Sequence, residues 1–187
     1  MWRRGQARLK SLFSKRPVTF LFWNLGRKNL TGAVVAAVAE HGVDILILAE
    51  AEGLSVRDCL FTLNRDLASA FHCPASGTEW LTLITRFDSA RMQRMGASDS
   101  DSEERWAFHK LHLPGSQAVH IVSVHLRSKV RAHDEDQYKR ARRLGKSILD
   151  VEATEASTRT LVVGDFNMDP FEHGMQACDG LHALLSQ

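Results

Sequence analysis

The pattern of apolar and polar positions along the chain predicts a series of short strands. Each predicted strand is a run of five to nine residues rich in aliphatic, aromatic or β-branched side chains and bounded by turn-forming residues. The predicted strands are Val18–Trp23, Asp44–Leu48, Trp80–Thr85, Arg105–Leu113, Ala118–His125 and Thr160–Gly164. The fourth and fifth flank a Leu-Pro-Gly-Ser turn, which is typical of an antiparallel pair.

Amphipathic spacing predicts three helices between these strands. Thr31 would cap a helix over residues 32–41. Gly42 stands where the helix is expected to end with a residue in the left-handed backbone conformation. Ser55 would cap a second helix, and the third would run from Ala132 to about Glu155. The first helix and its flanking strands form a strand–helix–strand unit, so we expect an α/β fold.

Three of the apolar strands lead into side chains that carry oxygen. The first leads to Asn24, the second to Glu50, and the last to Asp165 and Asn167. Because side chains alternate along a strand, Asp165 and Asn167 are expected to project from one face. Carboxylate and amide groups at one edge of a sheet suit a site for a divalent cation and a phosphate oxygen. For the Gly-Asp pair taken alone, a simple turn is an equally good interpretation.

Four motifs in this order resemble the endonuclease/exonuclease/phosphatase superfamily. They are Trp23-Asn24, Asp44-Ile-Leu-Ile-Leu-Ala-Glu50, Ser123-Val-His125-Leu126 and Gly164-Asp165-Phe166-Asn167. That group includes deoxyribonuclease I-like nucleases, apurinic-site endonucleases, sphingomyelinases, inositol phosphatases and deadenylases. The resemblance spans Val18 to about Pro170. It implies an α/β sandwich of two packed, largely antiparallel sheets with helices outside.

The resemblance also implies roles for the residues at the strand ends. Glu50 would bind Mg²⁺ or Mn²⁺. Glu52 is the alternative ligand, because a residue two positions further along an extended chain points to the same face. Asn24 would hold a metal-bound water or orient Glu50. Asp165 would position or deprotonate the attacking water, and Asn167 would donate a hydrogen bond to a phosphate oxygen.

A second group of predicted site residues follows the fifth strand. By resemblance, His125 would contact the phosphate or act as the acid that protonates the leaving group, whereas a buried structural histidine is the alternative. Arg127 and Lys129, two residues apart, would supply positive charge to an anionic substrate.

One family motif is missing from the sequence. Members of the family close with a Ser-Asp-His motif on a late strand, but His173 and His182 stand in other contexts after Asn167. The sequence therefore indicates a domain over residues 17–187 that is C-terminally incomplete and truncated before the last strands. Loss of one transition-state donor typically costs roughly 10²–10³ in rate, so we expect this chain to be weakly active or inactive alone.

Composition and charge narrow the class of protein. The 187 residues are 44% hydrophobic and 25% charged, as in an ordinary soluble domain. Residues 1–16 carry six bases and no acid, which leaves 18 bases and 22 acids in the rest of the chain. This segment is expected to be a flexible basic arm, or an amphipathic helix that touches phosphates or anionic lipid. No apolar run is long enough to span a membrane.

The cysteines and glycines exclude other classes. Three cysteines without CxxC spacing argue against a disulfide framework or a zinc site, and indicate a reducing, cytoplasmic compartment. No glycine-rich phosphate loop follows any strand, which argues against a common nucleotide-binding domain.

The leading hypothesis is a Mg²⁺- or Mn²⁺-dependent phosphoesterase, with nucleic acid favoured as substrate. The alternative is a non-catalytic module of the same fold that binds nucleic acid or protein.

Overall fold

The computed structural model describes residues 17–66, 70–75, 78–96, 105–113, 115, 117–129 and 134–182. The predicted basic arm and most of the third helix's first turn lie outside these ranges. The elements in chain order are β1 (Phe20–Asn24), α1 (Thr31–His41), β2 (Ile45–Ala49), α2 (Val56–Asp66), β3 (Leu81–Thr85), β4 (Met92–Arg94), β5 (Trp106–Leu111), β6 (Val119–His125), α3 (Asp134–Glu155), β7 (Thr160–Asp165) and α4 (His173–Gln176).

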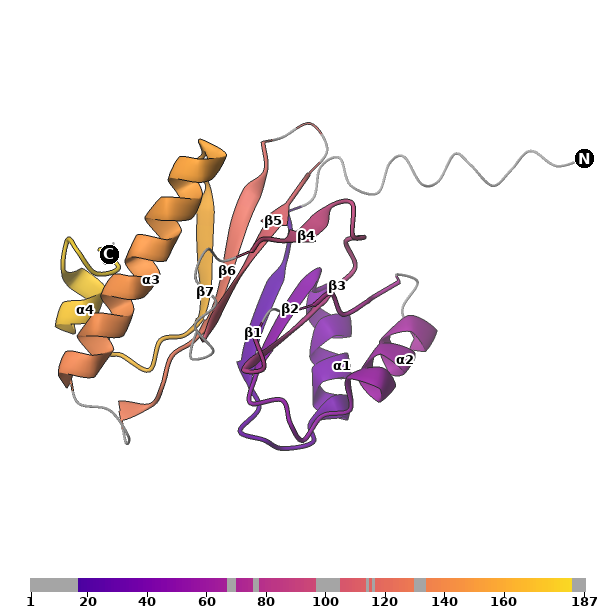
Figure 1. The fold of residues 1–187 in the computed structure, drawn as a ribbon. Helices are drawn as coiled ribbons and strands as arrows, with labels where there is room; N and C mark the ends of the chain where they lie inside the picture. The colour runs from indigo at the N-terminus through magenta and orange to yellow at the C-terminus, as the bar shows by residue number, and fades with distance from the viewer. Residues whose placement is uncertain are drawn as a thin grey trace, which may run out of the picture.

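These elements form two packed sheets with helices on the outside, as the sequence predicts. One sheet has the strand order β1-β2-β3 and the other β4-β5-β6-β7. Helices α1 and α2 cover the first sheet, and α3 with α4 lies outside the second (Figure 1). Both sheets are mixed, because β1 pairs with β2 and β6 with β7 in parallel. Each parallel pair is joined by a crossover helix, which is the connection that parallel neighbours require.

The core is divided between three layers of apolar side chains. Strand β2 is buried at every position because it lies between the helices and the other sheet. Its Leu46 and Leu48 pack toward α1 and α2, whereas Ile45 and Ile47 pack in the layer between the sheets. A third layer joins the second sheet to α3 through residues such as Leu144. Burying each of these side chains stabilises the fold by about 1.5–3 kcal/mol, which explains the uninterrupted apolar run.

Local signals in the sequence set most of the helix ends. Gly42 ends α1 with φ +58°, and the Ser55 hydroxyl accepts a hydrogen bond of 3.3 Å from the N–H of Asp58. The prediction that Thr31 caps α1 is wrong, because Thr31 is the first helical residue. Its N–H and hydroxyl both donate to the carboxamide oxygen of Asn29, at 3.3 and 2.8 Å. The side-chain acceptor at the start of α1 is therefore supplied by Asn29, two residues earlier, and not by Thr31.

Cys59 packs in the core of the first layer, as its helical spacing predicts. Its side chain is fully buried, and burial raises the pKa of its thiol to about 11. A thiol with so high a pKa is a poor nucleophile at neutral pH.

Among the helices of the described residues, none combines the length and the apolar character needed to cross a bilayer.

Candidate functional site

The strand ends that carry polar residues meet at one edge of the two sheets. In the first sheet Asn24 is paired in register with Ala49, the residue before Glu50. In the second sheet His125 is paired with Asp165. Because both pairings are parallel, the carboxyl ends of the four strands face the same way, and their polar residues are brought together.

A hydrogen bond between Asn24 and Asp165 links the two sheets at this edge. The amide Nδ2 of Asn24 donates to Oδ2 of Asp165 at 3.2 Å, and its Oδ1 accepts from the N–H of Gly26 at 3.0 Å. The other carboxylate oxygen of Asp165 accepts from the N–H of Asn167 at 2.9 Å. Asp165 is thus held from two sides. The carboxylate that Asn24 orients is that of Asp165, whereas the sequence led us to expect that of Glu50.

Gly164 allows the strand that bears Asp165 to approach its neighbour closely. A Cβ built on Gly164 would lie 1.9 Å from the carbonyl oxygen of Val124, with which it is paired. Any other residue would push β7 away from β6 and move Asp165. Glycine is therefore needed at position 164 because the two strands pack closely there, and not only because a turn follows.

Asn167 takes part in the site through a turn instead of strand alternation. Its φ of +51° places it in the left-handed region, so the expectation that it shares a strand face with Asp165 is wrong. The N–H contact to Asp165 closes an Asx-type turn. Its Nδ2 donates to the carbonyl of Leu126 at 2.7 Å. An amide nitrogen carries two hydrogens, so a second donor is left for a phosphate oxygen.

Backbone strain is concentrated around the site. Five non-glycine residues have positive φ in the described part of the chain, and Arg27, Glu50 and Asn167 are three of them. Such conformations cost of the order of 1–3 kcal/mol each and persist where surrounding contacts impose them. Here the N–H of Arg27 donates to the carbonyl of Glu50 at 2.9 Å, which ties together the loops after β1 and β2.

His125 lies deep in the site beside Glu50. Its side chain is 5% exposed, and Nε2 lies 3.6 Å from Oε1 of Glu50. Burial lowers the pKa of His125, and this effect outweighs the carboxylate of Asp165, which raises the pKa; Arg105 lowers it as well, and Glu50 and Glu52 raise it by less. The imidazole is therefore neutral at neutral pH, and its contact with Glu50 is a long polar contact, not an ion pair. A neutral histidine can donate a hydrogen bond to a phosphate but is a weak acid for a leaving group.

These residues surround a cleft of about 560 Å³, which we call the site cleft. It is lined by Arg27, Glu50, Glu52, Trp80, Arg105, His125, Arg127, Ser128 and Asn167. Four predicted site residues, Glu50, His125, Arg127 and Asn167, line it directly, and Asn24 and Asp165 are joined to it by the hydrogen bonds above. Lys129 is placed differently, because its ammonium group pairs with Glu172 and it is not among the lining residues.

Sequence reasoning missed Arg105 and Trp80. The guanidinium carbon of Arg105 lies 3.7 Å from the ring centroid of Trp80, a stacked cation–π contact. The carbonyl of Arg105 accepts from the N–H of His125 at 2.8 Å. A signal for this was present, since an antiparallel register that pairs Leu111 with Val119 also brings Arg105 beside His125.

Gln137 of α3 is a third residue that sequence reasoning missed, and it has a positioning role. It is 1% exposed, and its Nε2 donates to the carbonyl of Arg127 at 2.6 Å and to that of Asn167 at 3.4 Å. One buried amide thus holds the loops that follow β6 and β7. A glutamine on a long helix face gives no sign of this in sequence.

The donor set fits a hydrated divalent cation better than a fully protein-bound one. No cluster of three or more His, Cys, Asp or Glu side chains is placed to chelate a metal within the described ranges. Glu50, whose side chain is 32% exposed, offers a hard carboxylate to the cleft. Mg²⁺ commonly keeps several waters and binds through one or two carboxylates, which matches this arrangement.

Comparison with solved structures identifies the fold. The chain is similar to a humanized D. rerio TDP2 (16% identity, TM-score 0.54, covering 83% of this chain and 65% of that chain). It is also similar to the human Nocturnin catalytic domain with bound sulfate anion (14%, 0.59, 87% and 70%). A third is an endonuclease/exonuclease/phosphatase from Bacteroides vulgatus (15%, 0.50, 84% and 69%).

These similarities show that the chain has the endonuclease/exonuclease/phosphatase fold, as its motifs indicate. The chain spans slightly less than two thirds of the length of the TDP2 structure. No protein-family model matches the sequence, and no curated protein matches it.

Proposed function

We propose that this chain belongs to a divalent-metal-dependent phosphoesterase, with Mg²⁺ or Mn²⁺ as the cofactor and a phosphodiester as the substrate. The observation that carries the proposal is the meeting of Glu50, His125, Asp165 and Asn167 at one sheet edge, in a fold shared with a protein described as an endonuclease/exonuclease/phosphatase. A buried structural core would not need this set of polar groups in an open cleft.

Hydrolysis of a phosphate ester needs charge neutralisation, an oriented water and donors to the phosphoryl oxygens. A bound Mg²⁺, held by Glu50, would neutralise charge on those oxygens. The carboxylate of Asp165, which is held by Asn24 and Asn167, would orient a water by accepting its hydrogen. The remaining Nδ2 hydrogen of Asn167 and a ring N–H of His125 would donate to the phosphoryl oxygens.

The cations of the cleft favour a polyanionic substrate. Arg27, Arg105 and Arg127 come from three different segments and all line the site cleft. Arg105 is held flat on Trp80, so its donors are ordered before a phosphate binds. Successive phosphates of a nucleic acid strand would be attracted to several of these positive charges at once, and we therefore propose nucleic acid as the substrate class.

A comparison of two neighbouring glutamates tests the metal assignment. Hydrolysis of bis(p-nitrophenyl) phosphate by the purified chain is expected to be weak and to require Mg²⁺ or Mn²⁺, and Glu50→Gln should lower that rate by about 10²–10³. Glu52→Gln should lower it by less than about tenfold, because Glu52 lies 3.9 Å from Arg27 and its side chain is 55% exposed. Glu40→Gln on α1 serves as the control.

Binding of Mn²⁺, followed by electron paramagnetic resonance, separates the enzyme from the alternative. Metal binding that depends on Glu50, without any hydrolysis, would favour a metal-dependent binding module as the function of this chain by itself. Equal loss of activity in Glu50→Gln and Glu52→Gln would contradict the assignment of Glu50 as the ligand.

A further inference from the structure

Two of the side-chain contacts that join the sheets flank the candidate site, and they differ in chemistry. On the side of β1 and β7, the amide of Asn24 donates to the carboxylate of Asp165. On the side of β3 and β5, the guanidinium of Arg105 stacks on the indole ring of Trp80, with its central carbon 3.7 Å from the ring centroid. The first contact holds a carboxylate of the proposed chemistry. The second presents an aromatic ring, which phosphate hydrolysis by itself does not require.

Strand register places the Trp80–Arg105 stack one strand away from the proposed reacting centre. The antiparallel pairing of β2 with β3 places Trp80 beside Glu50, and the N–H of His125 donates to the carbonyl of Arg105 at 2.8 Å. All four residues line the site cleft. Because neighbouring strands lie about 5 Å apart, a phosphate held at Glu50 and His125 has the stack within reach of its own nucleoside.

The stack is closer than a chemically similar contact on α2. There the guanidinium carbon of Arg65 lies 5.9 Å from the ring centroid of Phe61, whose side chain is 66% exposed. Those two residues are four positions apart on one helix, so helix geometry alone makes them neighbours. Trp80 and Arg105 come from different sheets and meet only because the sheets pack together. The tertiary structure thus builds this stack at the cleft.

A guanidinium stacked on an indole offers a flat surface for another flat ring. Bases of a single strand stack on aromatic side chains and on guanidinium planes, whereas bases of a duplex are already stacked on one another. Trp80 and Arg105 are both only partly buried, so the pair keeps exposed surface at the cleft. A phosphate alone would use the charge of the arginine and make no use of the ring.

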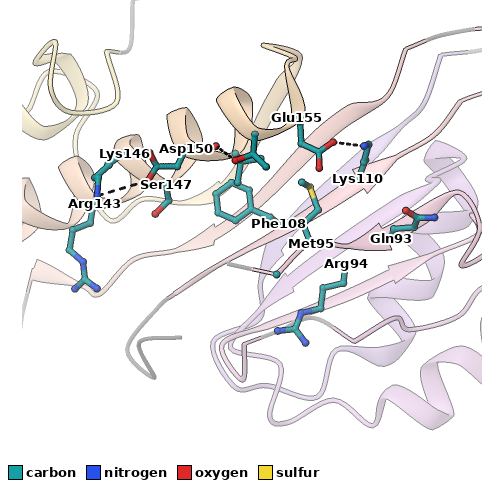
Figure 2. A pocket seen from close by; sticks show the side chains of 13 residues that line it. Gln93, Arg94, Met95, Phe108, Lys110, Arg143, Lys146, Ser147, Asp150 and Glu155 are labelled. Atoms are coloured by element: carbon teal, nitrogen blue, oxygen red, sulfur yellow. Dashed lines mark hydrogen bonds and ion pairs between the residues drawn. The ribbon is translucent and has the colours of Figure 1, made fainter. Parts of the chain in front are cut away.

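A second cleft, on the outer face of the four-stranded sheet, provides a contrast (Figure 2). It lies between edge strand β4 and the C-terminal half of α3 and encloses about 470 Å³. We call it the helix cleft and define it by six residues: Met95, Phe108, Lys110, Lys146, Asp150 and Glu155. Four basic and two acidic side chains line it, but Phe108, the one aromatic residue among those lining it, is 2% exposed. The helix cleft can attract a polyanion but offers no ring for a base.

The helix cleft is far from the site cleft. Gln137, near the start of α3, contacts the loops of the site cleft, whereas Val151, fourteen residues further along, lines the helix cleft. At 1.5 Å per residue this places the two regions about 20 Å apart. Signals from the helix cleft can therefore report binding that depends on charge alone.

We propose that the Trp80–Arg105 stack is a binding subsite for a nucleobase, and that the substrate of the site cleft is a single-stranded nucleic acid. One base stacks on the pair while its phosphodiester lies at Glu50 and His125. Stacking positions that phosphodiester for hydrolysis, and the same contact disfavours a duplex. This inference rests on the proposed function, because it names the substrate class of the same cleft.

Two decamers of equal charge test the base subsite. One is a thymidine decamer, and the other is a decamer of abasic tetrahydrofuran nucleotides, which has the same phosphates but no bases. Isothermal titration calorimetry measures their binding to the 187-residue chain with EDTA present, so that neither is hydrolysed. The abasic decamer should bind about tenfold more weakly, because it lacks base stacking. Equal affinity for the two decamers would overturn the proposal.

Indole signals in ¹H–¹⁵N NMR of the labelled chain locate the base. The indole N–H signal of Trp80 should shift more with the thymidine decamer than with the abasic one. Trp106 follows Arg105 in the chain but packs in the layer beneath α3, so its indole signal should stay in place. Any shift of the amide signal of Val151 should be the same for both decamers. A shift that depends on bases at Val151 but not at Trp80 would contradict the subsite.

Three variants separate stacking from charge. Trp80→Leu should weaken binding of the thymidine decamer about tenfold and leave the abasic decamer unaffected, while Trp80→Phe, which keeps a ring, should restore most of the affinity. Phe61→Leu removes the ring of the exposed pair on α2 and should leave both affinities unchanged. A circular dichroism melt shows that each variant is folded. Equal weakening by Phe61→Leu, or weaker binding of both decamers to Trp80→Leu, would contradict a base subsite.

The base subsite and the proposed hydrolytic activity fail in different ways. Metal-dependent hydrolysis of bis(p-nitrophenyl) phosphate together with equal affinity for the two decamers would keep the phosphoesterase and reject the subsite. Base-dependent binding at Trp80 without any hydrolysis would support the subsite and favour the binding module as the function of this chain by itself.

Discussion

The site cleft and the helix cleft are built by different physical means. In the site cleft the side chains follow the ends of buried strands, three backbone residues have positive φ, and Asp165 and Asn167 are held by hydrogen bonds. In the helix cleft the charged groups stand on regular helix and strand surfaces, and two pairs of them, Lys110 with Glu155 and Lys146 with Asp150, contact each other. The first arrangement fixes atoms in advance, as catalysis requires, whereas the second leaves side chains free to adapt to a ligand.

The largest expected difference between the two clefts is in rate. Asp165→Asn replaces an acceptor of two hydrogen bonds by a group that presents a donor to one of them. We expect phosphodiester hydrolysis to fall by about 10²–10⁴. Asp150→Asn in the helix cleft should leave the rate unchanged. Steady-state kinetics on bis(p-nitrophenyl) phosphate measure both, and a large effect of Asp150→Asn would show that the two regions are coupled.

A pair of glycine substitutions compares backbone strain inside and outside the site. Asn167 and Ala156 have φ of +51° and +49°, but Ala156 lies just after α3, away from the site cleft. Ala156→Gly should raise the free energy of unfolding by about 1 kcal/mol and leave the rate unchanged. Asn167→Gly relieves similar strain but loses the hydrogen bond to Leu126, so its stability should change little.

The rate should separate these two glycine variants. Asn167→Gly also removes a phosphate donor, and we expect a rate loss of roughly 10²–10³. Urea unfolding and kinetics on the same samples give both quantities. A rate in Asn167→Gly equal to that of Ala156→Gly would remove Asn167 from the chemistry.

The smallest expected difference is in the pH dependence of stability. Burial lowers the pKa of His125 below 6.5, so the unfolded chain takes up a proton first, and stability is lost as pH falls below about 6.5. The pKa of Glu155 is lowered below 4.5, chiefly by its hydrogen bond with Lys110, so its contribution is present above 4.5 and lost only at lower pH.

Urea unfolding in EDTA between pH 7 and 3 measures these two windows. His125→Gln should flatten the stability profile below about pH 6.5, where a single group contributes at most about 1.4 kcal/mol per pH unit. Glu155→Gln should change the profile only below pH 4.5. If His125→Gln leaves the upper window unchanged, the loss of stability there arises elsewhere.

Most elements of the fold were readable from the sequence because their signals are local. The apolar run of β2 and the helical spacing of Ala141 and Leu144 in α3 follow from burial with a fixed period. The runs that became β4, with three residues, and α4, with four, were too short to show a period, and neither was predicted. The prediction of Thr31 as the cap of α1 was wrong because the helix begins at Thr31 itself, with Leu30 in the cap position, and the sequence does not fix a helix end to the exact residue.

Part of the candidate site could be predicted from the sequence, again where the signals are local. Asn24, Glu50, His125 and Asp165 could be proposed because each stands at or just after the end of a recognisable strand, and parallel pairing brings such ends together. Their roles in metal binding and hydrolysis stay predictions until the variants above are measured. Arg105, Trp80 and Gln137 lie far apart in the chain and reach the site only through strand register and helix packing.

The sequence by itself determined where most of the strands and helices form and which strand ends carry oxygen-bearing side chains, because those properties depend on neighbouring residues. Tertiary structure alone decided that Asn24 contacts Asp165 across 141 positions, that Lys129 pairs with Glu172, and that a basic cleft opens between β4 and α3. These outcomes depend on how two sheets and a helix pack. Such packing is set by the summed burial of many side chains, and no single segment encodes it.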